Sequence, residues 1–284
     1  MDKQNIMGSL GDLTVETIPA TAPLLLNSLG IIVNPTSVLL VTKMAKFLWK
    51  VGLIDVFKDY ESNHMSNLQQ NKLEDVKTYA LKTVYQLMEK EGYDDSHPES
   101  ASYTHNFIDY SSDLLDKALK EGRQAKRFFL GAYLGSTIYT LNTSLPNWDN
   151  VFYLSSLIDR LTLRQIILIK LLTDGFNNIE DHDDLICVTN KVAISELKEL
   201  ASQNMWIGLI SYQPDPTYKA IPLKYILPTD LAMELISSTP LPDCINQSIN
   251  DVIKSLGLQP YSMTGLPDSF MMMIKKKMKM NSYK

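Results

Sequence analysis

The sequence predicts a mainly α protein, in which a helical bundle is followed by a winged-helix-like α+β module with a small β-hairpin. Apolar residues recur at three- and four-residue spacing through most of the chain, which is the spacing of amphipathic helices. After two further helical patterns beyond residue 150, two apolar runs follow, WIGLISY and YKAIPLKYIL, separated by the turn-forming QPDPT. Hydrophobic residues make up 45% of the 284 residues, enough for a sizeable buried core. We expect a bundle over 1–146, the module over 147–240, and a C-terminal extension over 241–284.

The first element is an uncharged passage from Thr17 to Thr42, the most apolar part of the chain. About 20 apolar residues can cross a bilayer, so length alone would permit a membrane span. Polar and helix-breaking residues near its middle argue against a span, because they would leave backbone groups unsatisfied in lipid; they are Asn27, Gly30, Asn34 and Pro35. We predict two short apolar segments joined by an Asn-Pro turn and buried against the helical core. Membrane contact through residues 18–42 is the alternative.

Four helices are predicted in the rest of the bundle. The run MAKFLWKVGLIDVFKDY keeps its apolar residues on one stripe and predicts a single amphipathic helix. A second helix follows in KLEDVKTYALKTVYQLMEKEG, with Gly92 as its stop signal. The third and fourth, at 102–121 and 123–141, are separated by Gly122. The fourth has almost no polar residue after Arg127 and places Gly131 four residues before Gly135, so we expect it to be the central core helix.

The module begins with the helix LTLRQIILIKLLTDG, which Thr162 can cap and Gly175 can end. The next helix, VAISELKELASQNMWI, occupies the position of a recognition helix, and its spacing points a set of apolar residues inward. That set is Val192, Ile194, Leu197 and Leu200. A last short helix is predicted to begin at Pro228-Thr229-Asp230.

The charge of the module argues against nucleic-acid binding. The whole chain has a net charge of −5, and residues 159–238 hold seven basic residues against eleven acidic ones. On the predicted outward face of the recognition helix, Glu196 and Glu199 outnumber Lys198. Because phosphate contacts supply most nonspecific affinity, such a face would repel a duplex. We therefore expect a protein partner, either another chain or a second copy of this one.

Four segments between residues 123 and 236 are considered together: AKRFFLGAYLGSTIYT, LIDRLTLRQIILIKLL, ISELKELASQNMWI and YILPTDLAMELI. In their hydrophobic pattern they resemble the bacterial abortive-infection alpha family. The resemblance implies a helical protein with a winged-helix-like end, a bacterial or phage origin, and a role in defence against phage. The family has no established catalytic residues, so the resemblance implies none here. The expected function is that of a non-enzymatic interaction protein, with a nucleic-acid-binding regulator as the alternative.

A second alternative is a metal-dependent phosphohydrolase. The consecutive residues 180–184 (Glu180, Asp181, His182, Asp183 and Asp184) are of metal-ligand types, and the His182-Asp183 pair with a second histidine such as His105 is faintly similar to His-Asp phosphohydrolases. Metal ligands must converge from rigid elements, whereas these five follow one another in a loop beside Asn177 and Asn178. We favour a solvated acidic loop, and we predict no catalytic, metal-binding or cofactor-binding residue and no enzymatic activity.

The two cysteines and the first residues indicate where the protein is located, and the last residues have an unusual composition. Cys187 and Cys244 have no metal-ligand spacing, and the first residues lack the basic start and apolar run of a secretory signal, so we expect a cytoplasmic protein. The C-terminal tail gathers methionines and lysines: Met271, Met272, Met273, Met278, Met280, Lys275, Lys276, Lys277 and Lys279. We expect a solvated tail, with contact to an anionic membrane or an acidic partner groove as the alternative.

Overall fold

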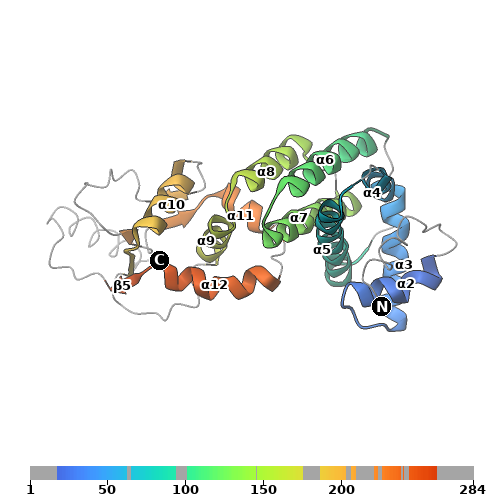
Figure 1. Ribbon diagram of the computed structural model, residues 1–284, viewed down its shortest axis with the longest axis horizontal. Helices are drawn as coiled ribbons and strands as arrows, with labels where there is room; N and C mark the ends of the chain where they lie inside the picture. Colours follow the sequence, from blue (N-terminus) through green and yellow to red (C-terminus); the bar gives the residue numbers. More distant parts are fainter. Residues whose placement is uncertain are drawn as a thin grey trace, which may run out of the picture.

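The computed structural model describes residues 18–62, 65–93, 101–144, 146–174, 186–202, 206–208, 221–222, 226–237, 239 and 243–260. Helices dominate these residues, which hold eleven helices and five strands of two or three residues. The predicted mainly α class is therefore confirmed. The molecule is elongated, with α2 to α7 at one end and the strands at the other (Figure 1).

The uncharged passage forms two helices, α2 (Ile18–Ser28) and α3 (Pro35–Lys50). Asn34 caps α3 in a reciprocal pair of hydrogen bonds with Ser37, and Pro35 occupies the first turn, where its missing N–H costs nothing. The Asn-Pro turn of the prediction is thus present. The burial prediction is only partly right, because one side of this pair faces the core while several of its apolar side chains are exposed.

The predicted single helix that follows the uncharged passage is wrong. The chain leaves α3 at Val51 and starts α4 (Leu53–Ser62) after Gly52, whose φ of 81° is a left-handed conformation that glycine adopts without strain. Both helices keep their apolar side chains on the same core, which is why the spacing continued across the break.

The centre of the bundle is the pair α5 (Asn67–Glu91) and α7 (Gln124–Thr143), which pack along each other. Gly131 and Gly135 let the two backbones approach closely: a Cβ on Gly131 would lie 2.6 Å from the carbonyl oxygen of Val76. The prediction that the fourth helix is the core helix is confirmed by its buried side chains, among them Phe129, Leu130, Leu134 and Ile138.

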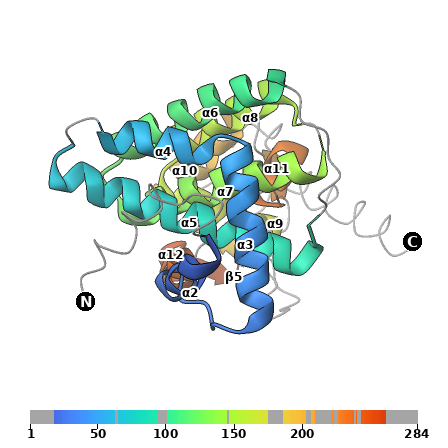
Figure 2. The same cartoon turned by 90° about the vertical axis from the view of Figure 1, so that its right-hand side faces the viewer.

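The other bundle helices surround this pair. α6 (Ala101–Lys120) packs on both α5 and α7, α3 packs on α5, and α4 joins α3 to α6. Figure 2 shows α3 crossing α5, with α4 at one end of α3 and α2 at the other. Helix α8 (Trp148–Arg160) lies on α6 and α7, where Tyr110 contacts the rings of Tyr133, Trp148 and Phe152.

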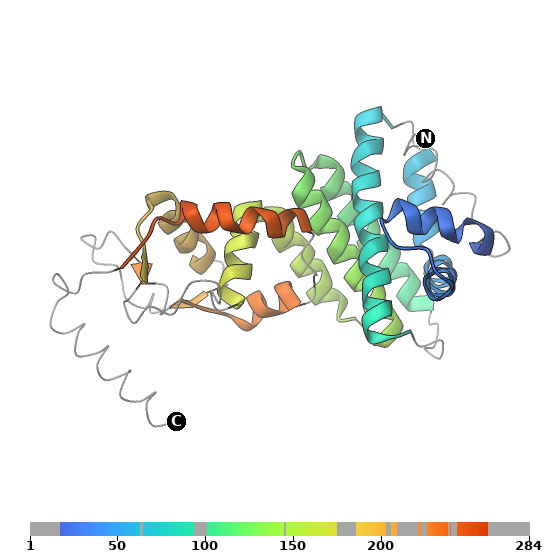
Figure 3. The same ribbon diagram turned by 90° about the horizontal axis from the view of Figure 1, so that it is seen from below.

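The C-terminal part is built around α9 (Leu163–Thr173), which contacts three other helices, α10 (Lys191–Ser202), α11 (Asp230–Ser237) and α12 (Asp243–Ser255). Five consecutive side chains of α9, from Gln165 to Ile169, are buried, as expected of a helix covered on all sides. Thr162 caps α9 as predicted, whereas the predicted stop at Gly175 lies outside the described residues. Figure 3 shows α12 running alongside this part of the molecule toward the bundle.

The strands form two small sheets. β2 (Trp206–Gly208) pairs antiparallel with β4 (Ile226–Pro228), the two apolar runs predicted to form the hairpin, but the QPDPT turn lies outside the described residues. β1 (Ile186–Val188) pairs with β3 (Ile221–Pro222) on one side and with β5 (Leu258–Pro260) on the other. Residues 243–260 thus supply a helix that packs on α9 and a strand that pairs with β1. The division at 146 and 240 remains a prediction.

Candidate functional site

The candidate site is the outward face of α10, the helix that the sequence predicts to be a recognition helix. Its inner face is fixed by Ala193, Leu197 and Leu200, all buried at helical spacing. Its exposed residues are Lys191, Val192, Ser195, Lys198 and Glu199. The expectation that Val192 points inward is wrong, since its side chain is 63% exposed and the inward position belongs to Ala193.

Both glutamates of α10 accept hydrogen bonds from α9, but Glu196 is the one withdrawn from solvent, while Glu199 stays exposed. Glu196 accepts a hydrogen bond from Arg164 Nε at 2.5 Å, and its side chain is only 16% exposed. Glu199 accepts a hydrogen bond at 3.0 Å from Gln165 Nε2. The prediction that the outward face carries both glutamates is therefore wrong for Glu196, which pairs with Arg164 at the start of α9.

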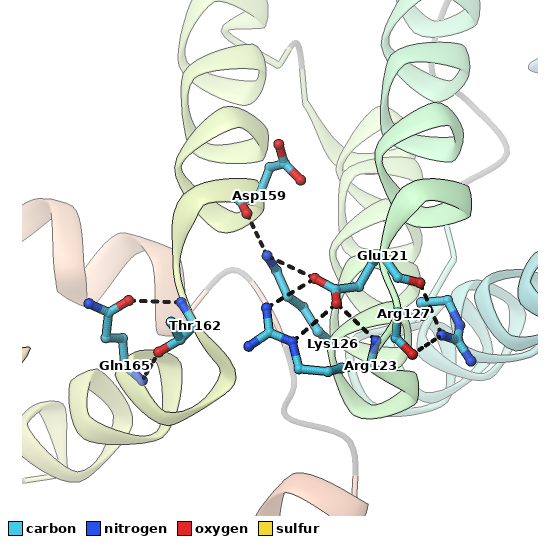
Figure 4. Close-up of polar contacts among 8 residues, drawn as sticks. Glu121, Arg123, Lys126, Arg127, Asp159, Thr162 and Gln165 are labelled. Atoms are coloured by element: carbon cyan, nitrogen blue, oxygen red, sulfur yellow. Dashed lines mark hydrogen bonds and ion pairs between the residues drawn. The ribbon is translucent and has the colours of Figure 1, made fainter.

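The start of α9 also holds the neighbouring elements together. The side-chain oxygen of Gln165 accepts a hydrogen bond from the backbone N–H of Thr162 (Figure 4). The amide group of the same side chain donates to Glu199, so one side chain caps α9 and holds α10. Arg164 donates through Nη1 to Ser255 Oγ on α12 at 2.6 Å. These contacts fix the position of α10 before any partner binds, which reduces the entropy lost on binding.

A second polar cluster lies where the bundle meets α8. Lys126, whose side chain is 3% exposed, pairs with Glu121 at 3.1 Å and donates to the backbone carbonyl of Asp159 at 2.5 Å (Figure 4). That carbonyl belongs to the last turn of α8, where a positive charge is favoured by the helix dipole. Arg123 also donates to Glu121. The cluster joins the α6–α7 turn to the C-terminal end of α8.

Two further cations are withdrawn from solvent in the bundle. Arg127 donates to Asp75 Oδ2 on α5 at 2.7 Å and to the backbone carbonyls of Glu121 and Gly122. Lys77, with a side chain 1% exposed, pairs with Glu61 on α4 and with Glu74 at 3.0 Å. Lys77, Lys126 and Arg127 therefore each contact a carboxylate while joining different helices.

The pKa of Glu121 gives this cluster a pH dependence. Burial alone would raise its pKa, but hydrogen bonds from Arg123 and Lys126 outweigh burial and lower the pKa to about 2. Because the folded-state value lies below the ordinary value of 4.5, Glu121 stabilises the fold above about pH 4.5 and loses this contribution as the pH falls toward 2.

We expect Glu121→Gln to lower the free energy of unfolding by about 3 kcal/mol at pH 7, and by much less near pH 2. Urea unfolding of both proteins across this pH range measures the difference. A constant difference between wild type and variant at every pH would show that the charge of Glu121 contributes nothing.

The residues of the phosphohydrolase alternative are not brought together in the part of the chain that the structure describes. Residues 180–184, with His182 and Asp183, lie outside that part, while His105 lies on the exposed side of α6, with Nε2 3.7 Å from Asp109. No group of three or more metal-ligating side chains occurs among the described residues. Cys187 lies in β1, where burial raises the pKa of its thiol to about 11; Cys244 is in α12.

None of the helices in the described ranges has the length and apolar character needed to cross a bilayer. No protein-family model, curated protein or solved structure matches the chain.

Proposed function

We propose that the protein is a non-enzymatic interaction protein of bacterial or phage origin, linked to phage defence, whose winged-helix-like module contacts a protein partner through α10. The observation that carries the proposal is the arrangement of α10. Val192 is 63% exposed between Lys191 and Ser195 on a helix that Arg164 and Gln165 hold in place. A rigidly held apolar side chain with a lysine beside it suits an apolar pocket with an acidic residue at its rim.

The contacts of the buried carboxylate Glu121 favour a binding function over a catalytic one. Catalytic acids and bases commonly have shifted pKa values and lie beside a pocket that a substrate can enter. The perturbed carboxylate Glu121 instead pairs with Arg123 and Lys126 and joins two helices. Its lowered pKa is therefore explained by a structural contact.

The alternative of a nucleic-acid-binding regulator gains support from one observation. Because Glu196 is paired with Arg164 on α9, the outward face of α10 carries Lys191 and Lys198 with Glu199 as its exposed acidic residue. Two lysines on a helix that could enter a groove provide phosphate contacts, and such binding would weaken steeply with salt. The outward face is thus less negative than the sequence indicates.

One pair of variants distinguishes the two functions. We expect Val192→Glu to abolish co-purification of a specific protein partner from the native host, because it places a charge at the centre of the contact. Leu68→Glu is the matched control, since Leu68 is 65% exposed on α5, and it should retain the partner. Purification of tagged full-length proteins, followed by mass spectrometry, measures both.

A different experimental outcome would favour the nucleic-acid-binding function over protein binding. In that case the wild-type protein is retained on duplex DNA in a salt-dependent manner, and Lys198→Glu weakens retention about fivefold or more. Partner loss with Leu68→Glu as well as Val192→Glu would also contradict the proposal, because it would remove any special role for α10.

A further inference from the structure

The turn between α2 and α3, together with the adjoining parts of both helices, exposes four apolar side chains. Ile32 is 82% exposed, Leu39 59%, Leu24 47% and Val33 40%. Ile32 and Val33 lie in the turn itself, Leu39 lies near the start of α3, and Leu24 lies on α2, which packs against α3. We call these four residues the apolar turn. Figure 2 shows the turn at the end of α3 that points away from α4.

Lysines continue the outer face of α3 beyond the apolar turn. Lys43, Lys46 and Lys50 follow Leu39 at steps of four, three and four residues, so the four residues lie on one face of the helix. Trp49, half exposed, lies beside them. These lysines are the only charged residues between residues 17 and 54, so this segment is positive. The chain as a whole has a net charge of −5. The first acidic residue after them is Asp55, in α4 at the opposite end of α3.

We propose that the apolar turn docks onto an anionic membrane surface. With a helical rise of 1.5 Å per residue, Lys43 and Lys46 lie about 6 and 10 Å beyond Leu39 along α3. Apolar side chains of interfacial helices enter the boundary of headgroups and acyl chains by about 5–10 Å. When Ile32, Val33 and Leu39 enter that boundary, the lysines lie at the level of the lipid phosphates. This is contact with one leaflet, and it is independent of the protein contact proposed for α10.

Three features together favour a membrane as the occupant of this surface. The exposed apolar side chains cluster at the turn between α2 and α3, the positive charge is confined to the helix face directly behind them, and the half-exposed Trp49 lies next to Lys50. Tryptophan is enriched where membranes meet water, and basic residues next to apolar anchors are attracted to anionic lipids. A protein partner at the same turn is the competing outcome.

Flotation of the full-length protein with lipid vesicles tests the proposal. We expect binding to vesicles of phosphatidylcholine with phosphatidylserine, weakening with salt, and at least about tenfold less binding to phosphatidylcholine alone. The double variant Ile32→Glu with Leu39→Glu should lower binding about tenfold or more, and Lys46→Glu about fivefold. Because these side chains are largely exposed, circular dichroism should show unchanged folding.

Matched controls separate the site from general effects of charge. Leu68→Glu and Lys120→Glu introduce the same charges at exposed positions on α5 and α6, and each should leave binding within about twofold of wild type. Equal losses in the controls and in the turn variants would overturn the proposal. It would also be overturned if wild-type protein failed to bind either vesicle. Deleting residues 269–284 gives a third test, since loss of all binding in that variant alone would assign the contact to the basic tail.

Discussion

Replacing Gly135 with alanine is expected to lower the free energy of unfolding by about 3 kcal/mol, one of the two largest effects predicted for this chain. A Cβ at this position would overlap the carbonyl oxygen of Ala80 and lie 2.8 Å from the Cβ of Thr83, both on α5. Neither obstacle is the flexible end of a side chain, so α5 and α7 must move apart along their central contact. At roughly 2–4 °C per kcal/mol, the melting temperature should fall by about 10 °C.

The sign of this effect is diagnostic, because alanine is the better helix former. In an exposed helix the same replacement would stabilise by about 1 kcal/mol. Gly122→Ala is the control, since a Cβ there would meet nothing within 4 Å, and its melting temperature should stay near that of wild type. A Gly135→Ala protein that melts at or above the wild-type temperature would show that the two helices do not pack as closely as described.

The central helix α7 was predictable from sequence because burial on all sides is the best explanation of its apolar pattern. A run with almost no polar residue after Arg127 has to be buried from every direction in a folded chain, and α7 is buried in this way. The glycine spacing indicated close helix contact, although nothing local identified α5 as the partner. Caps were equally readable: Thr162 and Asn34 stand directly before helical runs and accept hydrogen bonds from the third residue of each helix.

The break at Gly52 was not predictable from periodicity. Leu48, Leu53, Ile54 and Phe57 line the same small cavity, so apolar side chains recur at helical spacing on both sides of the break. A single residue with positive φ turns the chain without disturbing that pattern. Glycine inside a helical pattern is tolerated often enough that its presence alone does not identify a break.

The outward face of α10 was mispredicted at Glu196 for a different reason. Its glutamates are paired with Arg164 and Gln165, more than 30 residues earlier in the chain. Charge counting treats each carboxylate as solvated, and only the packing of α9 against α10 shows that these two are engaged. The strand β5 and its pairing with β1 were missed likewise, since three residues after a helix carry no periodic signal.

Replacing Lys126 with alanine is expected to destabilise the protein by about 3–5 kcal/mol, because it leaves Glu121 buried with less compensating charge and removes a donor from the end of α8. The side chains of Lys126 and Glu121 are 3% and 11% exposed, so water cannot replace the lost contact well. The effect should exceed that of any exposed lysine, because the same substitution at a surface site costs little. Urea unfolding at pH 7 measures it, with Lys120→Ala as the control expected to stay within about 0.5 kcal/mol of wild type.

A double-mutant cycle separates the pair from simple loss of packing. Lys126→Met keeps the apolar stem and removes the charge, and combining it with Glu121→Gln removes both charges from the buried site. If the penalty comes from an uncompensated carboxylate, the double variant should be less destabilised than the sum of the two single variants, by about 1–3 kcal/mol. Strict additivity would mean that Lys126 acts mainly through the Asp159 carbonyl at the end of α8. The cluster would then join the bundle to α8 as a helix cap, with the ion pair contributing little.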